Sequence, residues 1–333
     1  MEIQAIITTI TNVSIAIFGF AILHFAGTAK ALTITYALSA GTGALASIIA
    51  VKREFGHVIK NFNKSLVRPV ISATWPMAFT ALIGAFMLNT DVIMLGWFKD
   101  ATEVGLYSAG QKVVLLLYAL PTIFVTSVFP VLSRLVGQNE EERVRELVEK
   151  SMALINAMAI PLSVGGIILG QSLIEFLYGA EFTAAATTFR ILMLTILFTY
   201  AGGFIGNLIL AYNMQRKVPL YWGASSAGNF ILNAVLIPPF GAMGAAIATV
   251  IAQVMVNGLG WLMIRRVKKF YILKYLKNIA VAAILMGAAS FFMDFAGVQV
   301  LINIFLSACL YWLILYFLKE NLVSEILELV KRV

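Results

Sequence analysis

Residues 298–318 read VQVLINIFLSACLYWLILYFL, an apolar run without a single Asp, Glu, Lys or Arg. An α-helix needs roughly 20 apolar residues to cross the ~30 Å hydrocarbon core of a bilayer. The whole chain has the same character, because 61% of its 333 residues are hydrophobic and only 12% are charged. Soluble domains carry about 25% charged residues. The sequence therefore predicts an integral membrane protein.

Apolar runs between polar breaks predict about ten transmembrane helices. The runs cover residues 5–26, 31–51, 70–98, 104–133, 151–177, 184–212, 218–237, 241–264, 275–293 and 298–318. Lipid cannot satisfy backbone polar groups, so a spanning segment must be a helix or part of a closed barrel. Barrel strands alternate in polarity over about ten residues, whereas these runs are longer and uniformly apolar. The expected fold is all-α and polytopic.

The basic residues are distributed unevenly among the loops. If successive loops alternate between the two sides of the membrane, one side holds 20 of the 24 Lys and Arg residues and the other holds only Lys30 and Lys99. The positive-inside rule places the basic loops and both termini in the cytoplasm. A nucleic-acid surface would be one continuous basic face. Here the basic residues lie in loops between apolar spans, so the net charge of +8 does not indicate a nucleic-acid partner.

Few residues are available for catalysis or for a cofactor. The His and Cys residues are His24, His57 and Cys309, so no metal site is predicted. Residues 105–112, GLYSAGQK, approach a phosphate-binding loop, but Gln111 stands where the motif needs Lys and no strand precedes it. The external loops are too short to hold a catalytic domain. The sequence predicts neither an enzyme nor a bound cofactor.

The ionisable residues inside the predicted spans include Asp91, Lys112, Glu175 and Arg190. A charge in lipid costs a few kcal/mol, so each needs a partner or a polar cavity. Asp91 and Lys112 lie roughly 10 and 13 Å below the ends of consecutive helices. They can form an ion pair that fixes the helix hairpin, or they can line a cavity for proton coupling or phosphate contact. Arg190 can pair with Glu175 or face a cavity, where its planar fork suits a phosphate.

Amide side chains form two short stripes. Asn229 and Asn233 are four residues apart on one predicted helix, and Gln253 and Asn257 repeat that spacing on the next. Residues four apart share a helix face. The stripes either form hydrogen bonds between helices or line a hydrated path that passes a sugar.

Prolines and glycines inside the runs predict bent and closely packed helices. The run 104–133 would be about 45 Å long as a straight helix, so it must tilt, bend or protrude. Pro121 and Pro130 lie within it and permit bends. Two small-residue motifs allow close helix approach, Gly166-x-x-x-Gly170 and Gly202-x-x-x-Gly206. Such helices suit rocking transporters, although structural membrane proteins use them too.

An ordered series of short motifs runs through the chain. They are Trp75-Pro76, NTDVIMLG (89–96), EVGLYSA (103–109), Leu120-Pro121, FPVLS (129–133), NAVLIP (233–238), Gly241 and GAAIAT (244–249). The first five resemble the seventh and eighth helices, and the last three the eleventh and twelfth helices, of bacterial and archaeal polysaccharide flippases. These flippases belong to the multidrug/oligosaccharidyl-lipid/polysaccharide exporter superfamily, and Asp91 matches a position of their motif.

The resemblance implies an O-antigen-type flippase in the cytoplasmic membrane, which translocates polyprenyl-pyrophosphate-linked oligosaccharide for surface polysaccharide synthesis. Members have fourteen helices in two lobes around a central cavity, and this chain matches the last ten. We therefore expect the chain to be a fragment or a separate chain to supply the missing helices. The expected parts are two helices of the first lobe (1–53), a basic cytoplasmic linker (54–69), the six-helix second lobe (70–265), a final helix pair (266–318) and an amphipathic cytoplasmic tail (319–333).

Other interpretations stay open. An ion-coupled drug exporter of the same superfamily would share the fold, and a truncated, non-functional remnant would share the motifs. A membrane polysaccharide polymerase or ligase is less favoured, because such an enzyme would need a large charged external loop. The expected partners are a lipid-linked oligosaccharide and membrane lipids, and the site residues are Asp91, Lys112, Arg190, Asn229, Asn233, Gln253 and Asn257.

Overall fold

A computed structural model of the protein describes residues 2–26, 28–56, 65, 67–214, 218–266, 270–271 and 273–318. Every regular element in these ranges is a helix. The elements are α1 (Glu2–Ala26), α2 (Ala29–Phe55), α3 (Val67–Phe98), α4 (Ala101–Tyr118), α5 (Leu120–Gly137), α6 (Glu141–Ile168), α7 (Gly170–Tyr178), the 3₁₀ helix η2 (Ala180–Phe182), α8 (Ala185–Ala211), α9 (Val218–Arg265), α10 (Leu273–Phe295) and α11 (Val300–Phe317).

The predicted all-α membrane fold is confirmed. Among the described residues, eight helical segments are long and apolar enough to cross a membrane by length and composition. Large aromatic side chains cover the outside of α10 and α11, among them Phe291, Phe295 and Phe305. Soluble monomers rarely expose such continuous apolar surface. The predicted tail at 319–333 and most of the predicted linker at 54–69 lie outside the described residues.

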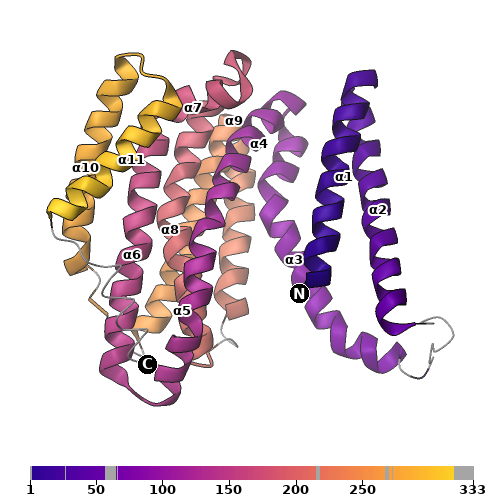
Figure 1. The fold of residues 1–333 in the computed structure, drawn as a ribbon, viewed down its shortest axis with the longest axis horizontal. Coiled ribbons are helices and arrows are strands. Elements are labelled where there is room, and N and C mark those ends of the chain that lie inside the picture. Colours follow the sequence, from indigo (N-terminus) through magenta and orange to yellow (C-terminus); the bar gives the residue numbers. More distant parts are fainter. Residues whose placement is uncertain are drawn as a thin grey trace. The chain divides into compact units, whose positions relative to one another are not determined.

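The chain divides into two compact units, Met1–Leu82 and Ile83–Val333. In the first unit α1 and α2 pack against each other as a hairpin (Figure 1). A hydrogen bond between two small polar residues joins the helices, in which Thr42 Oγ1 donates to Ser14 Oγ at 3.0 Å. The finer division into a linker, a second lobe and a final helix pair stays a prediction.

In the second unit α8 is the central helix and packs against α4, α5, α6, α7 and α9 (Figure 1). Phe189, Tyr200 and Phe204 are fully buried on this helix. A helix that is apolar on all sides is expected at the centre of a bundle. The α10–α11 pair packs beside α6, where Tyr311 donates a hydrogen bond to the carbonyl of Ala157 at 2.8 Å.

The run 104–133 forms two consecutive helices, because α4 ends and α5 begins at Ala119. Pro121 has no N–H, so the carbonyl of Leu117 loses its helical donor. The hydroxyl of Tyr200 on α8 donates to this carbonyl at 2.6 Å. The junction of α4 and α5 is therefore stabilised by the central helix of the unit.

The predicted run 151–177 differs from the helices that form. The helix α6 begins ten residues earlier, at Glu141, and ends at Ile168, after which α7 is a separate short helix. The early turns of α6 are polar and carry ion pairs, including Glu140–Arg143 at 2.8 Å. Hydropathy marks only the part of a helix that lies in lipid, whereas the i,i+4 spacing of Glu142 with Glu146 and of Arg145 with Glu149 indicates that the preceding charged run is helical too.

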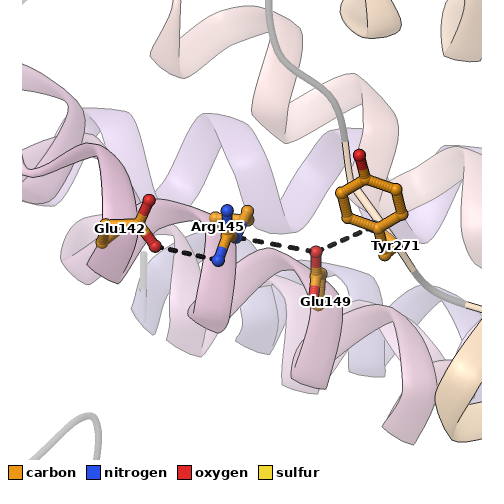
Figure 2. Close-up of polar contacts among 4 residues, drawn as sticks. All are labelled: Glu142, Arg145, Glu149 and Tyr271. Atoms are coloured by element: carbon orange, nitrogen blue, oxygen red, sulfur yellow. Dashed lines mark hydrogen bonds and ion pairs between the residues drawn. The ribbon is translucent and has the colours of Figure 1, made fainter.

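Glu149 joins α6 to the segment between α9 and α10 (Figure 2). Its carboxylate accepts a hydrogen bond from the backbone N–H of Tyr271 at 2.8 Å, and Arg145 Nε lies 4.0 Å away. The Glu149 side chain is buried, and a buried carboxylate needs such partners. This contact fixes the segment that precedes α10 against α6.

Candidate functional site

Asp91 lies near the end of α3 and is only 5% exposed. Its carboxylate accepts hydrogen bonds from Tyr107 Oη at 2.7 Å, Thr249 Oγ1 at 2.7 Å and Asn233 Nδ2 at 2.6 Å. The donors come from α4 and from both halves of α9, and all of them are uncharged. We call these four residues the Asp91 cluster.

The helix α9 consists of two helices that meet at Gly241, which has φ 55° and ψ −134°. A positive φ strains residues that carry a Cβ, so Gly is suited to this position. Glu103, in the first turn of α4, accepts a hydrogen bond from the backbone N–H of Ala242 at 2.7 Å. The carboxylate caps the second half of α9 and ties it to α4. The contact thus joins α4, which carries Tyr107, to the half of α9 that carries Thr249.

The predicted ion pair between Asp91 and Lys112 is wrong for the part of the chain that the structure describes. Lys112 follows Tyr107 by five residues on α4, and five residues advance a helix by one turn plus about 140°. Because Tyr107 faces Asp91, Lys112 faces another direction and is exposed. The uncharged donors occupy the carboxylate instead.

A cavity of about 450 Å³ lies beside the Asp91 cluster, inside the second unit. Asp91, Asn229, Gln253 and Asn257 line it. Asn233 is not a lining residue, but its Nδ2 bridges Asp91 and the Oδ1 of Asn229, the latter at 3.1 Å. The structure therefore brings together these five predicted site residues. We call this space the second-unit cavity.

Each helix presents one face to the second-unit cavity. On α4 the lining residues are Tyr107, Gln111, Val114, Leu115 and Tyr118. On the second half of α9 they are Thr249, Ala252, Gln253, Val256, Asn257 and Gly260. These spacings of three and four residues describe a single helix face. The cavity is thus built from regular helices rather than from loops.

The helices α8 and α9 approach closely at Gly202. A Cβ at Gly202 would overlap Asn257 Oδ1. Asn257 Nδ2 donates to both the backbone oxygen and the Oε1 of Gln253, at 2.8 and 3.0 Å. The predicted close approach at the Gly202 motif is confirmed, and it places the amide pair against the backbone of α8.

Arg190 and Glu175 do not line the second-unit cavity. Arg190 extends along Gly170, where a Cβ would lie 2.7 Å from its Cγ. Glu175 instead accepts hydrogen bonds from Gln171 at 3.0 Å and from Thr183 at 2.8 Å, and these bonds lower the pKa of Glu175. Within the described residues the pairing of Arg190 with Glu175 is therefore not formed. Glu175 also lies in α7, outside the apolar spans.

Several residues of this site had no role in the sequence analysis. Tyr107 and Thr249 lie inside the quoted motifs, and the spacing of four residues to Gln111 and Gln253 was the available signal. No comparable signal identified the aromatic lining residues, which are Tyr118, Tyr221 and Trp222. In an apolar span, the spacing of the aromatic residues does not show whether they face lipid, the protein core or a cavity.

Comparison with known proteins agrees with the resemblance. A family model described as polysaccharide biosynthesis protein matches residues 1–187. The probable flippase AglR of Haloferax volcanii is 28% identical over 166 residues, which are 49% of this chain and 35% of that protein. The probable low-salt glycan biosynthesis flippase Agl15 of the same organism is 26% identical over 169 residues, 51% of this chain and 36% of that protein. The chain thus spans about a third of the length of these relatives.

A solved structure of the lipid II flippase MurJ, in an inward closed conformation, has the same fold. It matches with a TM-score of 0.78 at 21% identity, over 96% of this chain and 68% of that chain. This likeness supports the helical architecture. The family model covers more than half of the sequence, and the chain belongs to the polysaccharide biosynthesis protein family.

Proposed function

We propose that this chain is a transporter that moves polyprenyl-pyrophosphate-linked oligosaccharide across the cytoplasmic membrane for surface polysaccharide synthesis. Its family, the flippase names of two relatives and the fold of a lipid II flippase support this proposal. The distribution of basic residues supports an orientation with both termini in the cytoplasm. The proposed mechanism is alternating access, in which the second-unit cavity forms part of the path.

The observation that carries the proposal is the Asp91 cluster on the wall of the second-unit cavity. Among the described residues no Lys, Arg or His lies within ion-pair distance of Asp91. A carboxylate buried without an opposite charge is costly inside a membrane protein. We infer that Asp91 takes up a proton or a small cation at one stage of transport and releases it at another. Such exchange would couple an ion gradient to the change of conformation.

The amide residues contribute polar contacts to the proposed path. Asn229, Gln253 and Asn257 give the cavity hydrogen-bond donors and acceptors without adding charge. Lys112 and Arg190 lie outside the lining of this cavity. Their contact with a phosphate stays a prediction, and the proposed path in the second unit does not depend on it.

An ion-coupled drug exporter is the second candidate function. Tyr118, Tyr221 and Trp222 line the same cavity as Asp91, and aromatic faces beside a carboxylate suit organic cations. An exporter would raise the resistance of cells to cationic drugs, whereas a flippase would change surface polysaccharide. Measurements of drug resistance and of surface polysaccharide therefore distinguish the two functions.

The proposal is tested in cells of the source organism from which the gene has been deleted. The wild-type gene should restore surface polysaccharide, and Asp91→Asn should leave lipid-linked oligosaccharide accumulating inside. Glu142→Gln is the matched control, because this exposed carboxylate pairs with the exposed Arg145 at 2.9 Å and such pairs contribute little. Normal surface polysaccharide with Asp91→Asn would refute the coupling role, and drug resistance without any effect on polysaccharide would favour the exporter.

A further inference from the structure

The charge of the second-unit cavity points to the part of the cargo that enters it. Asp91 is the one charged residue among the described residues that line it. Sites that hold phosphate groups in proteins use Arg or Lys, which supply opposite charge and several donors. A pyrophosphate in this cavity would meet a carboxylate and no cationic side chain. Like charges at short range in a low-dielectric site repel strongly, so the lining disfavours the anionic part of a lipid-linked oligosaccharide.

Hydrogen-bonding groups in the lining are neutral. Gln111, Asn229, Gln253 and Asn257 each offer an amide that can both donate and accept. Ser225 also lines the cavity, is only 4% exposed, and its hydroxyl has no hydrogen-bond partner in the structure. A buried hydroxyl without a partner is costly, and a ligand hydroxyl would satisfy it. Sugars carry hydroxyl groups that donate and accept in the same way.

Aromatic rings complete the lining. Tyr221 and Trp222 come from the first half of α9 and Tyr118 from α4. A sugar ring has polar edges and apolar C–H faces, and an aromatic side chain with a polar tip matches both. The volume of about 450 Å³ lies within the usual range for small ligands, about 300–1,000 Å³. The cavity has room for a few sugar residues.

We infer that the second-unit cavity binds uncharged sugar residues of the transported lipid and keeps the pyrophosphate outside. This inference rests on the proposed function, because it names the part of the cargo that this site takes. The amides, the Ser225 hydroxyl and the aromatic rings recognise the sugar, and Asp91 with its neutral surroundings excludes the anion.

Anion exclusion is measured with a cysteine placed in the lining. The chain has one cysteine, so Ser225→Cys is made together with Cys309→Ser in the full chain in detergent. The labelling rates by the uncharged hydroxyethyl and the anionic sulfonatoethyl methanethiosulfonates are each divided by the rate with free cysteine. We expect the uncharged reagent to be favoured roughly tenfold, the order of a single like-charge repulsion, and Asp91→Asn to reduce this ratio. Equal labelling by both reagents would overturn the inference.

Two controls keep this measurement decisive. Gln138→Cys, on the exposed end of α5, should show no preference for the uncharged reagent. Ser226→Cys, the neighbouring lining position, replaces Ser225→Cys if that variant does not elute as a folded protein.

Contact with sugar is measured by photo-crosslinking in cells of the source organism. The photoreactive residue p-benzoylphenylalanine replaces Tyr221, and the adduct is identified by mass spectrometry. Adducts that contain sugar residues support the inference, whereas adducts with a polyprenyl chain alone, with a drug-like cation, or no adduct at all overturn it. If translocation is intact but sugar adducts are missing, the sugar site fails and the flippase proposal stands. If sugar adducts form without translocation, the flippase proposal fails and the sugar site stands.

Discussion

Hydrogen bonds rather than an opposite charge hold the carboxylate of Asp91. Each hydrogen bond to a charged group contributes about 1.5–3 kcal/mol to stability. Three neutral donors at 2.6–2.7 Å therefore offset part of the cost of burial. Under the proposed coupling role, a bound ion would offset the remaining cost.

Tyr107→Phe tests the strength of this arrangement. The variant keeps the shape of the ring and removes the 2.7 Å hydrogen bond to Asp91. We expect the free energy of unfolding to fall by about 1–3 kcal/mol, measured by titration of the protein in mild detergent with a denaturing detergent. Tyr316→Phe on the exposed surface of α11 is the control, and surface substitutions change stability by at most about 0.5 kcal/mol. Equal stability of the two variants would contradict the account.

At the scale of helices, the sequence predicted the apolar spans well because hydropathy reports directly on the lipid solvent. It also separated the runs 218–237 and 241–264, and the two halves of α9 meet at Gly241 between them. A helix interruption is expected at Pro121, because Pro removes a backbone donor, and α5 begins one residue before it. Hydropathy alone placed the run at 151–177 and left out the first turns of α6, because those turns are polar. The partner of Asp91 was missed for a different reason. Depth in the membrane can be counted from the sequence, but the rotation of each helix is set by packing between distant segments.

Gly202→Ala tests the close approach of α8 and α9. The added methyl group would overlap Asn257 Oδ1, and such overpacking costs about 1–3 kcal/mol. Gly203→Ala is a matched control on the next residue, where a Cβ would meet nothing within 4 Å. That variant should be neutral or slightly stabilising, because Ala favours a helix over Gly. Equal thermal unfolding of both variants in detergent would show that the contact at Gly202 does not limit the packing.

Glu103→Ala tests the cap on the second half of α9. Loss of the carboxylate leaves the N–H of Ala242 without its 2.7 Å partner, and loss of a cap costs about 0.5–2 kcal/mol. Glu103→Gln retains an acceptor and should lose less. The unfolding midpoints in detergent should therefore fall in the order wild type, Gln, Ala. The opposite order for the two variants would rule out the cap as a stabilising contact.

At the scale of the whole molecule, the fold and the site are predicted from different features of the sequence. The fold matches that of a lipid II flippase over nearly the whole chain. Its all-α, membrane-spanning character could be predicted from composition and span length. The site is formed by a few polar residues that lie on the cavity-facing sides of their helices. Asn229, Asn233, Gln253 and Asn257 could be predicted from spacing alone, whereas the roles of Tyr107 and Thr249 needed the packed structure. The proposed function also needs a cavity that opens to both sides, and we propose Asp91 as the residue at which an ion drives that change.

Transport by the purified chain in liposomes is the most direct test of the coupling role of Asp91. The rate at which lipid-linked oligosaccharide becomes accessible to an external glycosidase is measured with and without an imposed proton or sodium gradient. The coupling role of Asp91 predicts that one of these gradients accelerates wild-type transport. It also predicts that Asp91→Asn abolishes this acceleration and slows transport roughly tenfold, within the usual range of coupling free energies. Transport by Asp91→Asn at the wild-type rate, with the same response to the gradient, would contradict the central role of Asp91.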